Sequence, residues 1–366
     1  MSKLEELIQQ YCPDGVEYKP LGDYLSYEQP TKYLVVNTKY DDSYLTPVLT
    51  AGQSFILGYT NEKEGIFQAS KDVPVIIFDD FTTSFHWVDF SFKVKSSAMK
   101  MLRPIDEKKA LFRYLFYCMK NILYVPGDHT RQWIGTYSQF EIPVPPLPVQ
   151  EEIVRILDNF TELQAELQAE LQKRLQQYNY YRDNLLSFEG RTDVKYLPIK
   201  EVLKIKNGRD YKHLGEGSVP VYGSGGIMTY VDTAVYDKPS VLIPRKGSID
   251  KLYYVDKPFW NVDTVFYTEI NKSILVEKYL FYLLQKEHLE RLNTAGGVPS
   301  LTQAVLNEVI ISIPALEEQK RIVSILDRFE ALTNDLTAGL PAEIAKRRQQ
   351  YEYYRDKLLT FKRKAA

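Results

Sequence analysis

Apolar residues follow a helical period in two long stretches of this chain. In the first stretch, which begins at Glu151, they recur at Ile153, Leu157, Phe160, Leu163, Leu167, Leu171, Leu175 and Tyr178. In the second they recur at Ile322, Leu326, Phe329, Leu332, Leu336, Leu340 and Ile344. One apolar face at this spacing predicts an amphipathic helix. If residues 151–188 form one continuous helix, it would be roughly 57 Å long at about 1.5 Å per residue.

The segments before and between these helices have a different pattern. Short β-rich runs, such as VPVIIF (73–78), SVLIPR (240–245) and KLYYV (251–255), stand near one helical run in each segment. The helical runs are LFRYLFYCMKNI (111–122) and VEKYLFYLLQ (276–285). Strand-like and helix-like runs mixed in this way predict two mixed α/β globules. The proline-containing segments PVPPLP and IPALEEQ interrupt regular secondary structure between each globule and the long helix that follows it.

The two halves of the chain repeat each other. IPVPPLPVQEEIVRILDNF (142–160) returns as ISIPALEEQKRIVSILDRF (311–329), and QQYNYYRDNLLSF (176–188) returns as QQYEYYRDKLLTF (349–361). Shorter matches follow in the same order: VEYKPLGDYL with VKYLPIKEVL, TPVLTAG with VPVYGSG, and RYLFY with KYLFY. The chain is therefore a tandem duplication with the order globule, helix, globule, helix.

This order predicts an α/β (α+β) fold with four segments. They are a first globule at 1–148, a central helix at 149–189, a second globule at 190–315 and a C-terminal helix at 316–362. An amphipathic helix must bury its apolar stripe, and two matched stripes in one chain most simply bury each other as an antiparallel pair. We therefore expect the globules to be separated by two long antiparallel coiled-coil helices in a pseudo-two-fold arrangement. The alternative is that the helices form only a domain core.

The second helix is not an exact copy of the first. Phe160 and Tyr178 are 18 positions apart (178 − 160), whereas the matching Phe329 and Tyr351 are 22 apart (351 − 329). The second helix therefore carries four additional residues. It also contains Gly339 and Pro341, and a proline inside a helix removes a hydrogen bond and clashes with the preceding turn. We expect a kink or break at 339–341.

Charge and composition exclude several classes of protein. The formal net charge of −2 argues against a generic polyanion binder, so any contact with nucleic acid must be local, or helped by a partner that wraps the duplex. The sequence has no apolar run of the roughly 18 residues that a membrane span needs, and MSKLEELIQQ lacks the apolar core of a signal peptide. We expect a cytoplasmic protein with no membrane partner. Cys12, Cys118 and the four histidines lack metal-ligand spacing, so no metal site is predicted.

Motifs of catalytic sites are missing from the sequence. It has no Asn-Pro-Pro-aromatic methyltransferase motif, no G-x-x-x-x-G-K-[ST] phosphate loop and no Gly-rich dinucleotide fingerprint. YGSGGIMTY (222–230) resembles a phosphate cradle, but no helix signal follows the glycines, so a tight turn is the better interpretation. The pair Asp79 and Asp80 has no obvious partner carboxylate or lysine nearby, and we interpret it as a strand end or turn.

The duplicated plan, the repeated elements at 142–160 and 176–188, and the central tetrads TELQAELQAELQ (161–172) resemble the specificity subunit of type I restriction-modification enzymes. The resemblance covers essentially the whole chain. It implies a non-catalytic protein in which each globule, a target-recognition domain, reads one half of a bipartite, asymmetric target in double-stranded DNA. It also implies that the helices fix the gap and dock two modification (methyltransferase) subunits, which methylate adenine N6, with restriction subunits joining the complex.

The resemblance implies no cofactor in this chain. S-adenosylmethionine, ATP and Mg are expected on the partner subunits.

Candidate DNA-binding residues lie in polar runs outside the core pattern, since Arg, Lys, Asn and Gln are the usual readers of base edges. In the first globule they come from TTSFH and HTRQW: Thr83, His86, His129, Arg131 and Gln132. In the second they come from KNGRDYKH and PRKGSIDK: Asn207, Arg209, Lys212, Arg245, Lys246 and Lys251. Each run could instead be an ordinary solvated loop.

Two other classes of function stay open. The chain could be a self-contained methyltransferase or nuclease, which would bind S-adenosylmethionine or cleave DNA alone, or a coiled-coil adaptor without direct DNA readout.

If the chain is a restriction-modification specificity subunit, the tetrads TELQAELQAELQ act as a spacer in the helix. Four residues advance a helix by roughly 6 Å and turn it by about 400°, so Leu163, Leu167 and Leu171 stay near one face. We hypothesise that the number of tetrads sets the gap between the half-sites.

Overall fold

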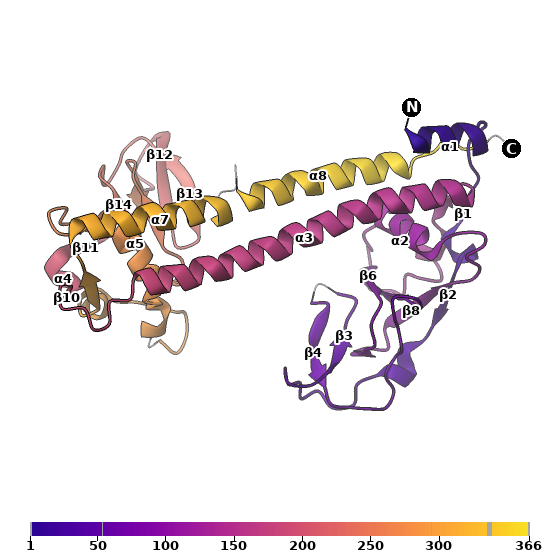
Figure 1. Ribbon diagram of the computed structural model, residues 1–366, viewed down its shortest axis with the longest axis horizontal. Coiled ribbons are helices and arrows are strands. Elements are labelled where there is room, and N and C mark those ends of the chain that lie inside the picture. The colour runs from indigo at the N-terminus through magenta and orange to yellow at the C-terminus, as the bar shows by residue number, and fades with distance from the viewer. Residues whose placement is uncertain (1, 53, 294, 335–338, 365–366) are drawn as a thin grey trace. The chain divides into compact units, whose positions relative to one another are not determined.

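The chain forms two compact units. The computed structural model describes residues 2–52, 54–293, 295–334 and 339–364 (Figure 1). The first unit consists of Met1–Glu166 with Ala345–Ala366, and the second of Leu167–Ile344. Each unit thus combines one globule with parts of the long helices, whereas the sequence assigned globules and helices to separate segments. The reason is that helix side chains near each globule are buried in the core of that globule.

The described part of the first globule contains two larger sheets, one two-stranded sheet and one main helix. A four-stranded sheet has the order β2-β8-β5-β6, and a three-stranded sheet has the order β4-β3-β7. The elements, with the pair β1-β9, are α1 (Lys3–Tyr11), β1 (Tyr18–Pro20), η1 (Leu21–Asp23), β2 (Leu25–Glu28), η2 (Pro30–Tyr33), β3 (Thr46–Leu49), β4 (Ile56–Thr60), β5 (Val75–Asp79), β6 (Phe85–Val88), β7 (Lys93–Val94), β8 (Met99–Pro104), α2 (Phe112–Asn121), η3 (Tyr137–Gln139) and β9 (Glu141–Pro143).

The globule of the second unit repeats this topology. Its four-stranded sheet has the order β11-β17-β14-β15 and its three-stranded sheet the order β13-β12-β16. The elements, with the pair β10-β18, are β10 (Lys195–Pro198), α4 (Ile199–Val202), β11 (Leu203–Asn207), β12 (Glu216–Gly223), β13 (Gly226–Val231), β14 (Ser240–Pro244), β15 (Tyr253–Val255), β16 (Trp260–Asn261), β17 (Val265–Ile270), α5 (Glu277–Lys286), η4 (Leu289–Leu292), α6 (Gln303–Asn307) and β18 (Ile310–Ile313). The predicted duplication and the mixed α/β class are confirmed.

The central strand of each four-stranded sheet is buried on both faces. In β5, Ile76 and Phe78 belong to the core that includes α2, whereas Val75 and Ile77 belong to the core that includes the three-stranded sheet. In β14, Ile243 faces α5 and Leu242 belongs to the core on the opposite face. Alternating side chains point to opposite faces of a strand, so each globule has three layers. They are a helix, a four-stranded sheet and a three-stranded sheet.

The long amphipathic stretches form three helices. The first stretch is α3 (Leu147–Leu185), and the second is divided into α7 (Leu316–Asn334) and α8 (Leu340–Leu358). Pro341 is the second residue of α8, where a proline costs no intrahelical hydrogen bond. The proline expected to interrupt one helix therefore lies in the first turn of another. Leu336, which the apolar pattern assigned to this region, lies outside the described residues.

Each unit contains one aromatic stack between long helices. In the first, Phe160 of α3 stacks on Tyr354 of α8 with ring centroids 5.5 Å apart. In the second, Tyr181 of α3 stacks on Phe329 of α7 at 5.4 Å. The partner number falls as the α3 number rises, which is the order of an antiparallel pairing. Both stacks come from the repeated elements QQYxYYRD and ILDxF.

A buried glutamine joins each globule to its long helix. Gln150 of α3 accepts a hydrogen bond from Leu111 N (2.9 Å) and donates to Pro145 O (2.7 Å) and Lys109 O (3.4 Å). Gln319 of α7 makes the equivalent bonds, with Val276 N (2.8 Å), Pro314 O and Ile274 O (both 2.9 Å). Both side chains are completely buried. Each amide therefore fixes the start of α2 or α5 against the start of its long helix.

A tyrosine and a carboxylate make a second, repeated joint. Tyr117 of α2 donates to Asp158 Oδ1 at 2.5 Å, and Tyr282 of α5 donates to Asp327 Oδ1 at 2.6 Å. A cation completes each joint, since Arg113 pairs with Asp158 and Lys278 pairs with Asp327, both at 2.8 Å. Burial raises the pKa of both tyrosines well above the ordinary value, so each hydroxyl stays a proton donor.

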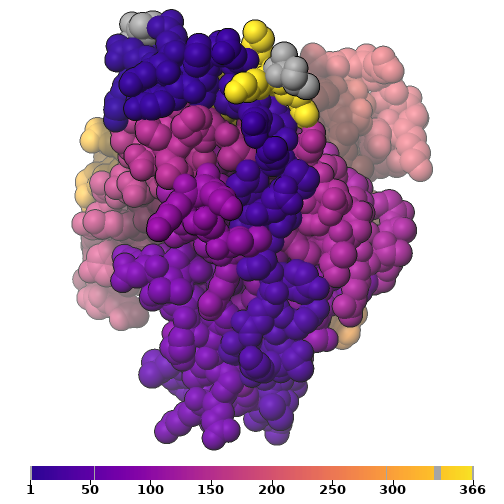
Figure 2. All heavy atoms as spheres, turned by 90° about the vertical axis from the view of Figure 1, so that its right-hand side faces the viewer, coloured from indigo at the N-terminus to yellow at the C-terminus, as the bar shows by residue number. Residues whose placement is uncertain are grey.

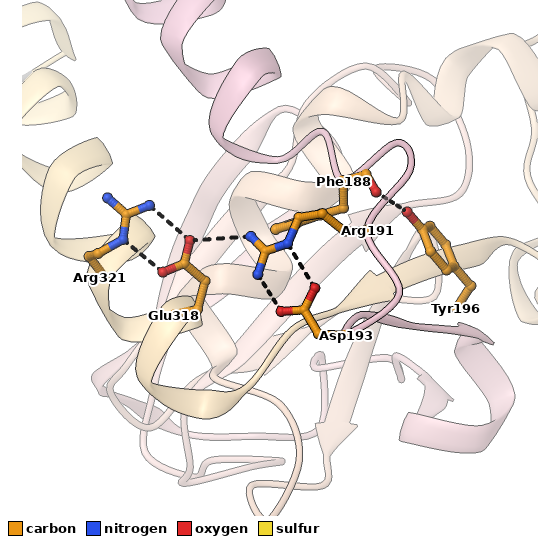
Figure 3. Close-up of polar contacts among 6 residues, drawn as sticks. All are labelled: Phe188, Arg191, Asp193, Tyr196, Glu318 and Arg321. Atoms are coloured by element: carbon orange, nitrogen blue, oxygen red, sulfur yellow. Dashed lines mark hydrogen bonds and ion pairs between the residues drawn. The ribbon is translucent and has the colours of Figure 1, made fainter.

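The segment after α3 is held by a small polar network (Figure 3). Tyr196 donates to Phe188 O at 3.0 Å, while Arg191 pairs with Asp193 and reaches Glu318 of α7 at 4.0 Å. In the first unit, Tyr18 donates to Phe361 O, also at 3.0 Å. The residues after α8 thus contact the first strand as the residues after α3 contact β10. Figure 2 shows these N-terminal (indigo) and C-terminal (yellow) residues side by side.

We predict that replacing either buried glutamine destabilises the protein. Gln150→Met and Gln319→Met keep the side-chain length but leave one N–H and two carbonyls without their partner. We expect a loss of about 2 kcal/mol or more in the free energy of unfolding, because unpaired buried polar groups cost about 1–3 kcal/mol each. Urea unfolding measures this loss. Gln172→Met, at an exposed position of α3, is the matched control, and equal effects would contradict the assigned role.

We also predict an acid-dependent contribution from Glu152 of α3. Its carboxylate is buried and pairs with Arg155 (2.6 Å) and Lys3 of α1 (2.8 Å). The hydrogen bond from Arg155, followed by that from Lys3, lowers the pKa of Glu152 from 4.5 to about 2. A pKa lowered by folding stabilises the fold above the unfolded value, and this stability is lost as the pH falls from about 5 through 2.

The free energy of unfolding of the wild type should therefore exceed that of Glu152→Gln at pH 6, and the difference should shrink towards pH 2. Urea titrations across this range measure it. Glu151→Gln, at the exposed neighbouring position, should show no comparable change with pH.

Candidate nucleic-acid interface

In the second unit, the predicted residues gather at one edge of the four-stranded sheet. Phe266 of β17 pairs with Asn207 of β11 on one side and with Ile243 of β14 on the other. Since neighbouring strands are about 4.8 Å apart, the ends of β11 and β14 are separated by roughly 10 Å. The runs KNGRDYKH and PRKGSIDK, distant in the sequence, therefore leave the sheet side by side.

Two further segments meet these runs. Leu301 N donates to Arg245 O at 2.9 Å, and Gln303 donates to the Asn207 side chain at 3.2 Å. From the β12-β13 hairpin, Ser224 O accepts a hydrogen bond from Tyr253 at 2.9 Å. Gly223 pairs with Gly226 across the end of that hairpin, so the tight turn predicted for YGSGG is confirmed. Four segments thus make one surface.

This surface is basic. Of its predicted residues, Asn207, Arg209, Lys212, Lys246 and Lys251 are exposed, and Arg245 is half-buried. The structure records no ion pair for these five cations within the described ranges, although the same two runs also contain the exposed Asp210 and Asp250. Unpaired cations on loops at a single edge suit a polyanionic ligand.

In the first unit, the predicted residues lie around the turn between β5 and β6. His86 of β6 stacks on Phe55 with ring centroids 4.5 Å apart, and its Nε2 lies 3.0 Å from Gly52 O. His129 stacks on Phe81 of the turn at 4.6 Å. The loop at 128–133 and the hairpin turn between β3 and β4 therefore both contact the β5-β6 region. His129 and Arg131 are exposed, and His86 is half-buried.

Two of the predicted contacts, Thr83 and Gln132, are buried instead of exposed. The Gln132 amide accepts from Tyr124 (2.7 Å) and donates to Thr130 O (3.0 Å) and Asp128 (3.2 Å). Thr83 has a positive φ of 58° and donates to Thr82 O. Both side chains are engaged within their own loops, so in this structure they support the surface and do not form it. Polar residue type alone did not distinguish these two roles.

The main residues missed from the sequence are a buried ion pair. Asp80, at the end of β5, lies 3.3 Å from Lys100 of β8, and both are at most 2% exposed. The Asp80 carboxylate also accepts the Trp133 N–H at 2.8 Å, and its carbonyl accepts the Gln132 N–H at 2.7 Å. Asp80 thus holds the loop at 128–133. A signal existed, because Lys100 interrupts the otherwise apolar strand Met99–Leu102.

The structure gives no support to a metal-dependent site. Asp79 caps its own turn by accepting the N–H groups of Phe81 and Thr82, both at 2.9 Å. Within the described ranges, no group of three or more His, Cys, Asp or Glu side chains is placed to hold a metal ion. Over the same residues, no helix is both long and apolar enough to cross a membrane.

The repeated α/β frame and the basic loop edge of the second unit suit modular recognition of a polyanion such as a nucleic acid. Comparison with known proteins specifies the class. Residues 13–177 and 192–346 each match the family model described as type I restriction modification DNA specificity domain. The chain belongs to the family of type I restriction-modification specificity subunits, the DNA-recognition subunits of these complexes.

The relatives match along nearly the whole chain. The chain is 43% identical to the type I restriction enzyme EcoR124I/EcoR124II specificity subunit of Escherichia coli, over 99% of this chain and 97% of that protein. It is 31% identical to a putative type I restriction enzyme specificity subunit of Haemophilus influenzae, over 84% and 86%.

The fold has also been seen before. The S subunit of a type I restriction-modification system from M. genitalium has a TM-score of 0.63 at 15% identity, over 94% of this chain and 96% of that one. At this identity the likeness concerns the fold alone.

We predict that the ion pair between Asp80 and Lys100 is needed to hold the 128–133 loop. Lys100→Met leaves the carboxylate buried and unpaired, which typically costs about 3–5 kcal/mol. The double variant Asp80→Asn/Lys100→Met should be less destabilised, because an asparagine oxygen still accepts the Trp133 N–H.

Urea unfolding measures the stability, and trypsin cleavage after the exposed Arg131 measures the order of the loop. Lys100→Met should speed that cleavage, and Lys95→Met, at an exposed position, should not. Unchanged cleavage in Lys100→Met would contradict the role.

Proposed function

We propose that each globule reads one half of a bipartite, asymmetric target in double-stranded DNA. The observation that carries this proposal is that the two units share one frame but not one set of edge loops. In the loops at the edge of the four-stranded sheet, the first unit presents His129 and Arg131, whereas the second unit presents Arg245, Lys246 and Lys251. Equivalent surfaces with different donors would read different bases, so the two half-sites differ.

The edge residues divide by chemistry. Contacts to phosphates position a protein on DNA, and contacts to base edges supply its specificity. We assign phosphate contacts to the exposed lysines Lys212, Lys246 and Lys251, which are flexible point charges. Arg131, Asn207 and Arg209, together with His86 and His129, are the candidate base readers. Thr83 and Gln132 act indirectly, by holding the loops of the first unit.

The long helices carry the partner subunits in this proposal. Exposed tyrosines recur at equivalent places, Tyr180 and Tyr181 on α3 and Tyr353 and Tyr354 on α8. Aromatic residues are enriched at protein interfaces, and a repeated aromatic patch suits two copies of one partner. We propose that two modification subunits dock there and methylate adenine N6, and that restriction subunits join them.

No cofactor is assigned to this chain in the proposal. S-adenosylmethionine belongs to the modification subunits, and ATP and Mg belong to the restriction subunits. The complex would act in the cytoplasm, where the cell's DNA is accessible.

Co-expression with the modification subunit in an unmethylated host, followed by genome-wide mapping of methyladenine, tests the proposal. The expected result is one bipartite motif with a fixed non-specific gap. Two other outcomes would overturn it. Methylation or DNA cleavage by the purified chain alone would indicate a self-contained enzyme. Absence of DNA binding by the assembled complex would indicate an adaptor protein.

The tetrads of α3 generate a prediction about the gap. Removing Ala165–Gln168 shortens the helix by roughly 6 Å, which compares with about 3.4 Å per base pair. The gap in the methylation motif should therefore shrink by one or two base pairs, while both half-sites stay unchanged. Glu166→Gln, which alters the tetrad but not its length, should leave the gap as it is. Altered half-site sequences after the deletion would contradict the role of a ruler.

A further inference from the structure

The repeated frame allows the two units to be compared position by position. In the first unit, the carbonyl of Asp80 accepts the N–H of Gln132, and in the second the carbonyl of Arg245 accepts the N–H of Leu301. The strand pairing agrees, because Phe78 pairs with Lys100 and Ile243 pairs with Phe266. Arg245 therefore occupies the place of Asp80, and Phe266 occupies the place of Lys100.

These equivalent positions carry opposite chemistry. In the first unit, the Asp80 carboxylate points to Lys100, and both charges are sealed in the interior at 3.3 Å. In the second unit, the Arg245 guanidinium lies over the Phe266 ring, 5.1 Å from its centroid. The same position in the frame is thus part of a buried ion pair in the first unit and a half-buried arginine in the second.

The Phe266 ring orients the Arg245 side chain, but no carboxylate among the described residues pairs with its charge. Its Nε is buried without a hydrogen-bond partner, and the guanidinium makes no recorded hydrogen bond or ion pair with the residues that the structure describes. Stacking on an aromatic ring restricts a guanidinium and leaves its outer edge available for a planar acceptor. A half-buried arginine with unused donors is thereby prepared for a ligand that offers two acceptors in one plane.

We propose that Arg245 is a specificity-determining residue that reads a guanine in the half-site of the second unit, an inference that rests on the proposed function. Guanine presents O6 and N7 as adjacent acceptors in the major groove, and a bidentate arginine is their commonest protein partner. The exposed Lys246 and Lys251 nearby contact phosphates. In the first unit the position of Arg245 is taken by Asp80, whose carboxylate is buried against Lys100, so its half-site is read by other residues.

Methylation mapping with variants in the complex with the modification subunit tests this proposal. Arg245→Gln and Arg245→Lys should reduce discrimination for guanine at one position of one half-site by about 5- to 100-fold. The other half-site and the gap should be unchanged. Arg245→Lys keeps the charge, so a loss in this variant reports the bidentate geometry. Phe266→Leu, which removes the stacking ring, should lower the same discrimination with Arg245 still present.

Three controls separate the outcomes. Lys246→Gln should weaken binding to all sequences and lower its salt dependence, with no change of motif. Arg131→Gln should alter only the opposite half-site, which identifies the half read by each unit. Thermal unfolding of each variant verifies that it is folded.

An unchanged motif in Arg245→Lys, equal weakening on all sequences in Arg245→Gln, or a half-site without guanine would each overturn the inference. Absence of any bipartite motif for the wild-type complex would instead overturn the proposed function itself.

Discussion

The rest of this structure depends on one constraint, the fixed orientation of each globule on its long helix. A buried glutamine and a tyrosine–carboxylate bond provide it in both units. These contacts are directional, unlike the apolar packing around them, because each hydrogen bond has a required geometry. A rotation of the globule would leave buried polar groups unpaired. The residues most clearly repeated in the sequence are therefore those that set an angle, and not only those that fill a core.

The helical and strand periods made the frame predictable from the sequence. The apolar period of α3, the strands β5 and β14 and the helices α2 and α5 all follow from local pattern, because each buries a regular face. The repeats made the duplication predictable as well, whereas the strand order within each sheet was not predicted. Residue type indicated that Pro341 would not lie in a helix interior, but its place in the first turn of α8 depends on where that helix begins.

The candidate site was less predictable, because burial in loops depends on distant partners. Lys100 and Asp80 meet only through the register of β8 against β5, which no local pattern encodes. Gln132 and Arg131 are adjacent polar residues, yet the Gln132 side chain is buried and hydrogen-bonded to Tyr124 and Asp128, whereas Arg131 is exposed. The basic residues of the second unit were easier to predict, since they lie at glycine-containing turns. Their proximity could not be predicted, because it depends on β17 pairing with both β11 and β14.

The strands β5 and β14 are buried on both faces, and some edge-loop residues, such as Trp133 and Ile249, belong to the cores that cover them. The exposed loop residues, such as Arg131, Lys246 and Lys251, lie outside these cores, so the frame does not depend on their side chains. Substitutions at these exposed positions can therefore change the surface that each unit presents while the buried loop residues and the joints to the long helices are kept. Within one loop, adjacent positions thus serve different purposes: Trp133 holds the fold, and Arg131 remains free to vary with the ligand.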